Sequence, residues 1–175
     1  MDIRSDTVAV AGYHRDLATM GTYDDITSVF VLDSDTPSDA EGWRLSREII
    51  PIVEVIETVA DPVQISLGSE WVHILFQDAR NDTTGIERLG VFYAHGNLGE
   101  QNWAFRKAMG DDAGGAQLAV LEGDDGEDIV VTGWRELDGY DAELVLSVTY
   151  SNLTEIASER VAAAGLLSLR FADTS

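Results

Sequence analysis

Short runs of alternating apolar and polar residues recur along the whole chain, separated by clusters of glycine, aspartate or asparagine. In AELVLSVTY, residues 142–150, Leu144, Leu146, Val148 and Tyr150 alternate with smaller or polar residues. A period of two is the pattern of a β-strand with two unlike faces. About eight to ten such runs, with turn residues roughly every 8–12 positions, are typical of a sandwich or barrel. The sequence therefore predicts an all-β fold, an antiparallel β-sandwich.

The N-terminal segment differs from this pattern. Residues 6–20 place three apolar side chains near helical spacing, and Gly21 follows them. These side chains are Val10, Leu17 and Met20. We expect an arm or short helix over residues 1–25, followed by one β-sandwich domain over residues 26–175.

A second segment, residues 49–60, is ambiguous. Its apolar residues fit a helical stripe, with Pro51 able to open a helix. The density of isoleucine, valine and threonine favours strands instead, with Pro51 at a bulge or an edge. We favour the strand, although a helix here would conflict with an eight-stranded fold.

The charge of the chain restricts its environment and its partners. It carries 32 acidic residues against 11 basic ones, a net charge of −21, and Lys107 is its only lysine. Self-repulsion of this size is largely screened in molar salt, where the Debye length is about 3 Å. Carboxylates without lysine stems expose little hydrocarbon, which we expect of proteins from haloarchaea or their viruses. The same charge disfavours binding to nucleic acid or to an anionic membrane surface.

Several classes of protein are disfavoured by what the sequence lacks. It has no cysteine, which excludes disulfides and thiolate nucleophiles. Its first ten residues hold no apolar core of signal-peptide length, and no apolar run approaches the roughly 18 residues of a membrane span. We expect a protein made in soluble form in the cytoplasm, without direct insertion into a membrane.

The densest acidic cluster is LEGDDGED, residues 121–128, with five carboxylates. Its spacing differs from that of an EF-hand calcium loop, and its flanks resemble strands. We therefore predict a β-hairpin around the turn GDDG, with Gly126 at positive φ. Asp124 and Asp128 are weak candidates for a shared metal ion, and no cofactor is predicted.

No catalytic constellation can be recognised in the sequence. His14, His73 and His95 lack metal-ligand spacing, and no serine lies in a nucleophile-elbow motif. His73 alternates with apolar neighbours, so we expect it to face solvent or to make a satisfied hydrogen bond in the core. His95 ends a predicted strand before Gly96, where catalytic residues can occur. We predict that the protein is not an enzyme and has no catalytic residues.

The candidate contact residues are two tryptophans and one basic patch. The four tryptophans are spread through the predicted strands, as expected of core or subunit-contact anchors, and we take Trp43 and Trp103 as interface candidates. FRK, residues 105–107, is the only local basic patch. Arg106 and Lys107 are candidates for docking on an acidic neighbour, including a second copy of the chain. Where acidic faces meet, high salt or bridging cations would have to screen the contact.

The arm MDIRSDTVAVAGYHRDLATMG, the strands from ITSVFVL to LLSLRF and the acidic, lysine-poor surface together resemble one family. It comprises the small single jelly-roll major capsid proteins of tailless, icosahedral, membrane-containing haloarchaeal viruses. The resemblance spans nearly the whole chain and rests on architecture and composition. It implies a single jelly roll, a self-assembling structural protein of the virion shell, and assembly in the host cytoplasm. It also implies homo-oligomers, a second coat protein as partner, and no enzymatic activity.

Two other classes remain open. The first is another virion component, such as a decoration, tail-tube or baseplate protein, which shares the β-rich profile without catalytic motifs. The second is a haloarchaeal enzyme or ligand-binding β-barrel, with His95 or a pair of carboxylates inside an apolar cavity.

Overall fold

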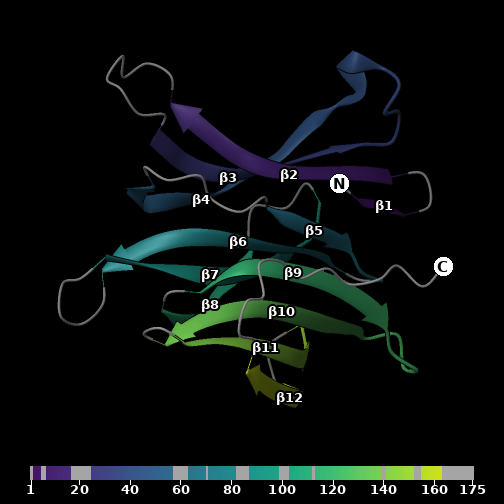
Figure 1. Cartoon of the computed structure of the whole chain (residues 1–175). Coiled ribbons are helices and arrows are strands. Elements are labelled where there is room, and N and C mark those ends of the chain that lie inside the picture. Colours follow the sequence, from purple (N-terminus) through teal and green to yellow (C-terminus); the bar gives the residue numbers. More distant parts are fainter. Residues whose placement is uncertain are drawn as a thin grey trace.

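Twelve antiparallel strands make up most of the described residues in the computed structural model of the chain (Figure 1). The structure describes residues 2–4, 7–16, 25–56, 63–69, 71–81, 87–98, 103–111, 113–138, 141–151 and 155–162. Within these ranges the only helical element is a 3₁₀ turn, η1 (Ala40–Gly42), and no helix is long and apolar enough to cross a membrane. The predicted all-β class is confirmed.

The strands form three sheets of four strands each, and in every sheet the neighbours in space are neighbours in sequence. The first sheet contains β1 (Asp2–Arg4), β2 (Thr7–Asp16), β3 (Asp25–Ser34) and β4 (Arg44–Ile56). The middle sheet contains β5 (Gln64–Leu67), β6 (Val72–Asn81), β7 (Glu87–Gly96) and β8 (Ala104–Asp111). The third sheet contains β9 (Ala113–Glu122), β10 (Asp128–Asp138), β11 (Asp141–Tyr150) and β12 (Glu155–Ala162).

The three sheets are stacked as layers, with the β5–β8 sheet between the other two (Figure 1). One face of the middle sheet packs on the first sheet through a cluster that includes Val29, Val31, Ile74 and Phe76. The opposite face packs on the third sheet through a cluster that includes Leu75, Val91, Val130 and Val145. Burial on both faces explains why residues 72–77 and 90–94 are all buried, as expected of strands that lie between two layers.

The predicted N-terminal helix is wrong, because residues 7–16 form strand β2. Ala9 is buried in the core, and Ala11 and Tyr13 on the same face pack against it, which is a period of two. Gly12 leaves room for the ring of its cross-strand partner on β3, since a Cβ on Gly12 would lie only 2.9 Å from Cζ of Phe30. Pairing with β3 thus overrides the helical spacing of the apolar residues. Two of those residues, Leu17 and Met20, lie outside the described part of the chain.

The strand interpretation of the ambiguous stretch is confirmed over residues 49–56, which belong to β4. Residues 57–60 lie outside the described part of the chain. Pro51 pairs with Ser28 beside two shifts of register, and β4 ends the strand order of its sheet. A proline lacks the N–H that a regular ladder needs, so an end strand with an irregular register suits it.

The single jelly roll is not confirmed. A jelly roll pairs strands that are far apart in sequence. Each of the three sheets described here is instead a meander of consecutive strands, joined by short connections.

The predicted hairpin at residues 121–128 is confirmed. β9 and β10 pair from Glu122 and Asp128 onward, and the N–H of Gly123 donates to the carbonyl of Glu127 at 2.8 Å. Gly126 has a φ of 83°, the positive value predicted for it. The hairpin matters for function because it delivers the side chain of Asp128 into the interior.

Candidate functional site

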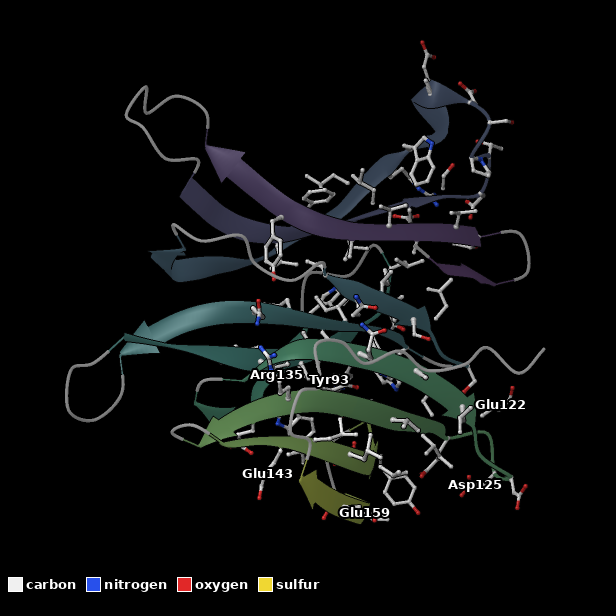
Figure 2. All side chains as sticks on the ribbon, in the orientation of Figure 1. Tyr93, Glu122, Asp125, Arg135, Glu143 and Glu159 are labelled. Atoms are coloured by element: carbon white, nitrogen blue, oxygen red, sulfur yellow. The ribbon has the colours of Figure 1, made fainter. Side chains whose placement is uncertain are left out.

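Asp128 is the one carboxylate of the acidic hairpin that is buried. The other four, at positions 122, 124, 125 and 127, are exposed, and Figure 2 shows Glu122 and Asp125 at the hairpin end of the third sheet. Asp128 is the first residue of β10 and shares its inward face with Val130 and Thr132. The alternation of β10 therefore directs this carboxylate towards the middle sheet.

The carboxylate of Asp128 accepts hydrogen bonds from the connection between β5 and β6 and from β6 itself. The backbone N–H groups of Ser69 and Trp71 donate to it, the latter at 3.1 Å. Nε2 of His73 lies 2.9 Å from Oδ2 of Asp128. The hydroxyl of Ser69 lies 2.6 Å from Oδ1 and 2.7 Å from the carbonyl oxygen of Gly126, and its single proton can serve either.

His73 extends these contacts to Tyr93 on β7. Nδ1 of His73 lies 2.6 Å from the hydroxyl of Tyr93, and both side chains are fully buried. Because Asp128 can only accept while it is ionised, Nε2 of His73 carries the proton and donates it. Nδ1 then accepts a hydrogen bond from the hydroxyl of Tyr93. We call Asp128, His73, Tyr93, Ser69 and the N–H of Trp71 the Asp128 network.

The charges of the Asp128 network follow from burial and hydrogen bonding. Burial disfavours the charged carboxylate, but the bonds from Ser69, His73 and Trp71 lower the pKa of Asp128 to about 2. Burial lowers the pKa of His73 despite the neighbouring carboxylate. Burial raises the pKa of Tyr93 well above its usual range, and the charge on Asp128 adds to this. Near neutral pH the network therefore holds one negative charge, a neutral imidazole and a protonated phenol.

Glycine and aromatic rings surround the Asp128 network. A Cβ on Gly68 would lie 2.1 Å from Oδ2 of Asp128, so only glycine allows the carboxylate this close. The ring of His95 lies 5.6 Å from that of Tyr93, 6.2 Å from that of His73 and 5.4 Å from that of Trp71, measured between centroids. These rings exclude water from the hydrogen bonds, which strengthens them.

The Asp128 network has the order carboxylate, imidazole, hydroxyl, which also occurs in hydrolases. Here the terminal hydroxyl is instead a buried phenol. The arrangement can connect β6 and β7 of the middle sheet to β10 of the third sheet. Its chemistry is that of a buried hydrogen-bond chain, and His95 contributes to it as a packed ring.

The two metal candidates do not come together. Asp124 is exposed on the turn, whereas Asp128 is buried and its two oxygens face donors of the protein. In the part of the chain that the structure describes, no three histidine or acidic side chains are grouped closely enough to hold a metal ion.

The predicted contact tryptophans are both partly buried within their own subunit. Trp103 packs against the core between the first and middle sheets and lies over Gly96, where a Cβ would be 2.6 Å from its Cγ. Trp43 follows η1, and its Nε1–H donates to the carbonyl of Pro37 at 3.3 Å. Each makes contacts within its own subunit and keeps part of its surface exposed, so their role as interface residues stays a prediction.

The basic patch lies on a strand whose side chains are not described. Arg106 and Lys107 belong to β8, in register with Tyr93 and Phe92 of β7. His14 lies on β2, and its side chain is likewise outside the described set.

Sequence reasoning did not identify Asp128, His73 and Tyr93 as partners. Their separations in sequence are 55 and 20 residues, and only the stacking of two sheets joins them. A weak signal exists in EWVHILFQ, where His73 interrupts a strand that is otherwise apolar over residues 72–76. A polar residue in such a strand needs a buried partner, but the sequence does not say which one.

Comparison with protein-family models, with curated proteins and with solved structures finds no match to this chain.

Proposed function

We propose that this protein is a self-assembling structural protein of a virion, the major capsid protein of a halophilic archaeal virus. The observation that carries the proposal is a set of large apolar side chains exposed on a highly acidic chain. Leu45, Leu121 and Tyr150 are 62%, 56% and 38% exposed, on a chain of net charge −21. Leu121 and Tyr150 both pair with Ile129, so they lie in one row across β9, β10 and β11. Clustered exposed apolar groups mark surfaces that another molecule covers.

The interior supports a structural role in a second way. The imidazole of His73, the carboxylate of Asp128 and the phenol of Tyr93 are bonded to one another in the core. A buried polar network with every member satisfied holds elements in one arrangement. Rigid subunits of this kind suit a protein that must present the same surface in every copy.

Composition supports the host and the compartment. Asp and Glu outnumber Lys and Arg by 32 to 11, which favours function in concentrated salt. We place the protein in the capsid shell after assembly in the cytoplasm of a haloarchaeal host. Its partners would be further copies and a second coat protein, with cations able to bridge acidic rims.

The meander topology favours a second candidate beside the capsid protein. A single jelly roll is part of the capsid proposal, and the sequential order of strands in each sheet gives it no support. A decoration, tail-tube or baseplate protein needs the same exposed apolar surface without that topology. Symmetry separates the two, because a capsid protein forms a closed lattice and the others form rings, trimers or tubes.

Electron microscopy of the purified protein in molar NaCl tests the proposal. Closed shells or sheets with lattice order are expected for a capsid protein. Rings or tubes of uniform diameter would transfer the proposal to the second candidate. Dispersed single subunits at every protein concentration would contradict self-assembly.

A further inference from the structure

The outward-facing side of the third sheet carries several partly exposed apolar side chains. It consists of positions 117, 119 and 121 of β9, 129 to 135 (odd) of β10, 144 to 150 (even) of β11, and 157 and 159 of β12. We call this surface the outer face of the third sheet. Its large members are Leu121, Ile129, Leu144, Leu146, Val148 and Tyr150, all partly or fully exposed. Nine of its thirteen residues are apolar, against 45% for the whole chain.

The alternating pattern of strand β11 places its larger apolar side chains on the outer face of the third sheet. Its larger apolar residues, at positions 144 to 150 (even), point outward, while Val145 and Thr149 point inward and are buried. Antiparallel sheets with one wet side usually direct their apolar residues inward. A strand that directs leucine, valine and tyrosine outward is one whose two faces are both covered in the working state.

Charge is sparse on this face and concentrated around it. Arg135 and Glu159 are its only charged members among the described residues. The exposed carboxylates of the β9–β10 hairpin lie at one end of the same sheet (Figure 2). An apolar centre with a charged rim is the usual anatomy of a protein–protein interface.

We infer that the outer face of the third sheet binds the same face of a second copy of this chain. The inference rests on the proposed function, because it names the surface through which the subunits assemble. The face is large enough: four strands of 8 to 11 residues span roughly 500 Å² in plane, and the side chains add relief. A specific interface should bury at least about 1,000 Å² in total, or about 500 Å² on each partner.

A second copy is the occupant that the geometry favours. The chain already stacks four-stranded sheets twice, first on middle and middle on third. A second copy supplies a four-stranded face of the same length and polarity, and sheets pack face to face about 10 Å apart. Since each copy carries a net charge of −21, the copies can approach only where carboxylates are few, and Glu159 is the one carboxylate among the described side chains of this face.

Introduced cysteines test the contact directly, because the chain has none of its own. In a symmetric contact, residues near the two-fold axis lie close to their own counterparts. We expect Leu144→Cys, Leu146→Cys or Val148→Cys, made singly, to give disulfide-linked dimers on mild oxidation in molar NaCl. The control Leu45→Cys, on an exposed position of the first sheet, should stay unlinked.

A matched pair of charge substitutions gives a second test. Leu121→Glu and Leu45→Glu each add one carboxylate at a similarly exposed strand position, so neither should prevent folding. Leu121→Glu should raise the dissociation constant of the assembly at least about tenfold, since it places a charge in a covered apolar face. Leu45→Glu should leave it unchanged.

The outcomes separate this inference from the proposed function. The inference would be overturned if the wild-type protein assembles, the cysteines on β11 give no linked dimers and Leu121→Glu assembles normally. The proposed function would still stand in that case. A wild-type protein that stays a single subunit in molar salt would overturn both. We expect disulfide-linked dimers from the cysteines on β11. We also expect assembly to be weakened in Leu121→Glu and unchanged in Leu45→Glu.

Discussion

At the scale of single residues, the most informative group is Asp128. It sits in a segment with five carboxylates, yet only this one is buried, and donors of the middle sheet face it. The difference comes from the alternation of β10, which turns Asp128 towards Ser69 and His73 and leaves Asp124 in solvent. One of several similar carboxylates in the sequence therefore has a distinct role in the folded protein.

Replacing Asp128 by asparagine should destabilise the protein by about 2–4 kcal/mol. The amide cannot accept from all of the donors that now point at the carboxylate, and buried donors without partners are costly. Urea denaturation at constant molar salt measures the effect. Asp124→Asn on the same turn serves as the control and should leave the midpoint almost unchanged. Equal midpoints for the two variants would contradict the network.

The lowered pKa of His73 predicts a loss of stability in acid. The unfolded chain binds a proton at His73 near pH 6.5, while the folded chain does not until a lower pH. The contribution of His73 to the free energy of unfolding is therefore fully present above pH 6.5. It decreases as the pH falls below that value, by up to about 1.4 kcal/mol per pH unit. Denaturation series between pH 8 and about 5 on wild type and His73→Gln measure it.

Because His14 and His95 are present in both proteins, their contributions cancel in the difference. The variant should be less stable at pH 8 and less sensitive to acid than the wild type. A wild-type curve as flat as that of the variant would show that His73 titrates normally in the folded state.

At the scale of elements, the connection between β5 and β6 forms the hydrogen-bonded contact with Asp128 of the third sheet, beside the apolar packing of the two sheets. The N–H of Gly68 donates to the carbonyl of Trp71 at 2.8 Å, which closes a tight turn against Asp128. The turn can approach the carboxylate only because Gly68 has no side chain.

Gly68→Ala should therefore destabilise the protein by about as much as Asp128→Asn, because the new Cβ displaces the carboxylate from its donors. Gly126→Ala is the informative comparison: its φ of 83° is strained for alanine, but nothing lies within 4 Å of the added Cβ. That variant should lose only about 1 kcal/mol. A Gly68→Ala protein with wild-type stability would show that the carboxylate can move away freely.

The sequence predicted elements better than their assembly. Alternation identified β11, and turn chemistry identified the hairpin with Gly126, because both signals are local. The helical spacing of Val10, Leu17 and Met20 was misleading, since β2 is stabilised by its pairing with β3. The Asp128 network could not be predicted, because it depends on how the middle and third sheets stack.

At the scale of the whole molecule, charge and apolar surface act in opposite directions. A net charge of −21 opposes both folding and association in dilute buffer. Leu121, Tyr150 and their neighbours on the third sheet favour association once that repulsion is screened. Concentrated salt is the condition in which both requirements are met.

Thermal stability should increase steadily as NaCl is raised from low to molar concentration. The reason is that carboxylate repulsion within one subunit is screened, since the Debye length shrinks from about 30 Å at 0.01 M to about 3 Å at 1 M. Circular dichroism melts of the poorly assembling Leu121→Glu variant isolate this effect from association. A melting temperature independent of salt would contradict the assigned environment.

The most direct test of self-assembly is the particle mass of the wild-type protein by light scattering, in molar NaCl and after dialysis to low salt. Large, discrete particles in molar NaCl that dissociate on dialysis are the predicted result. A mass equal to one subunit, 19.0 kDa, in both conditions would contradict the account.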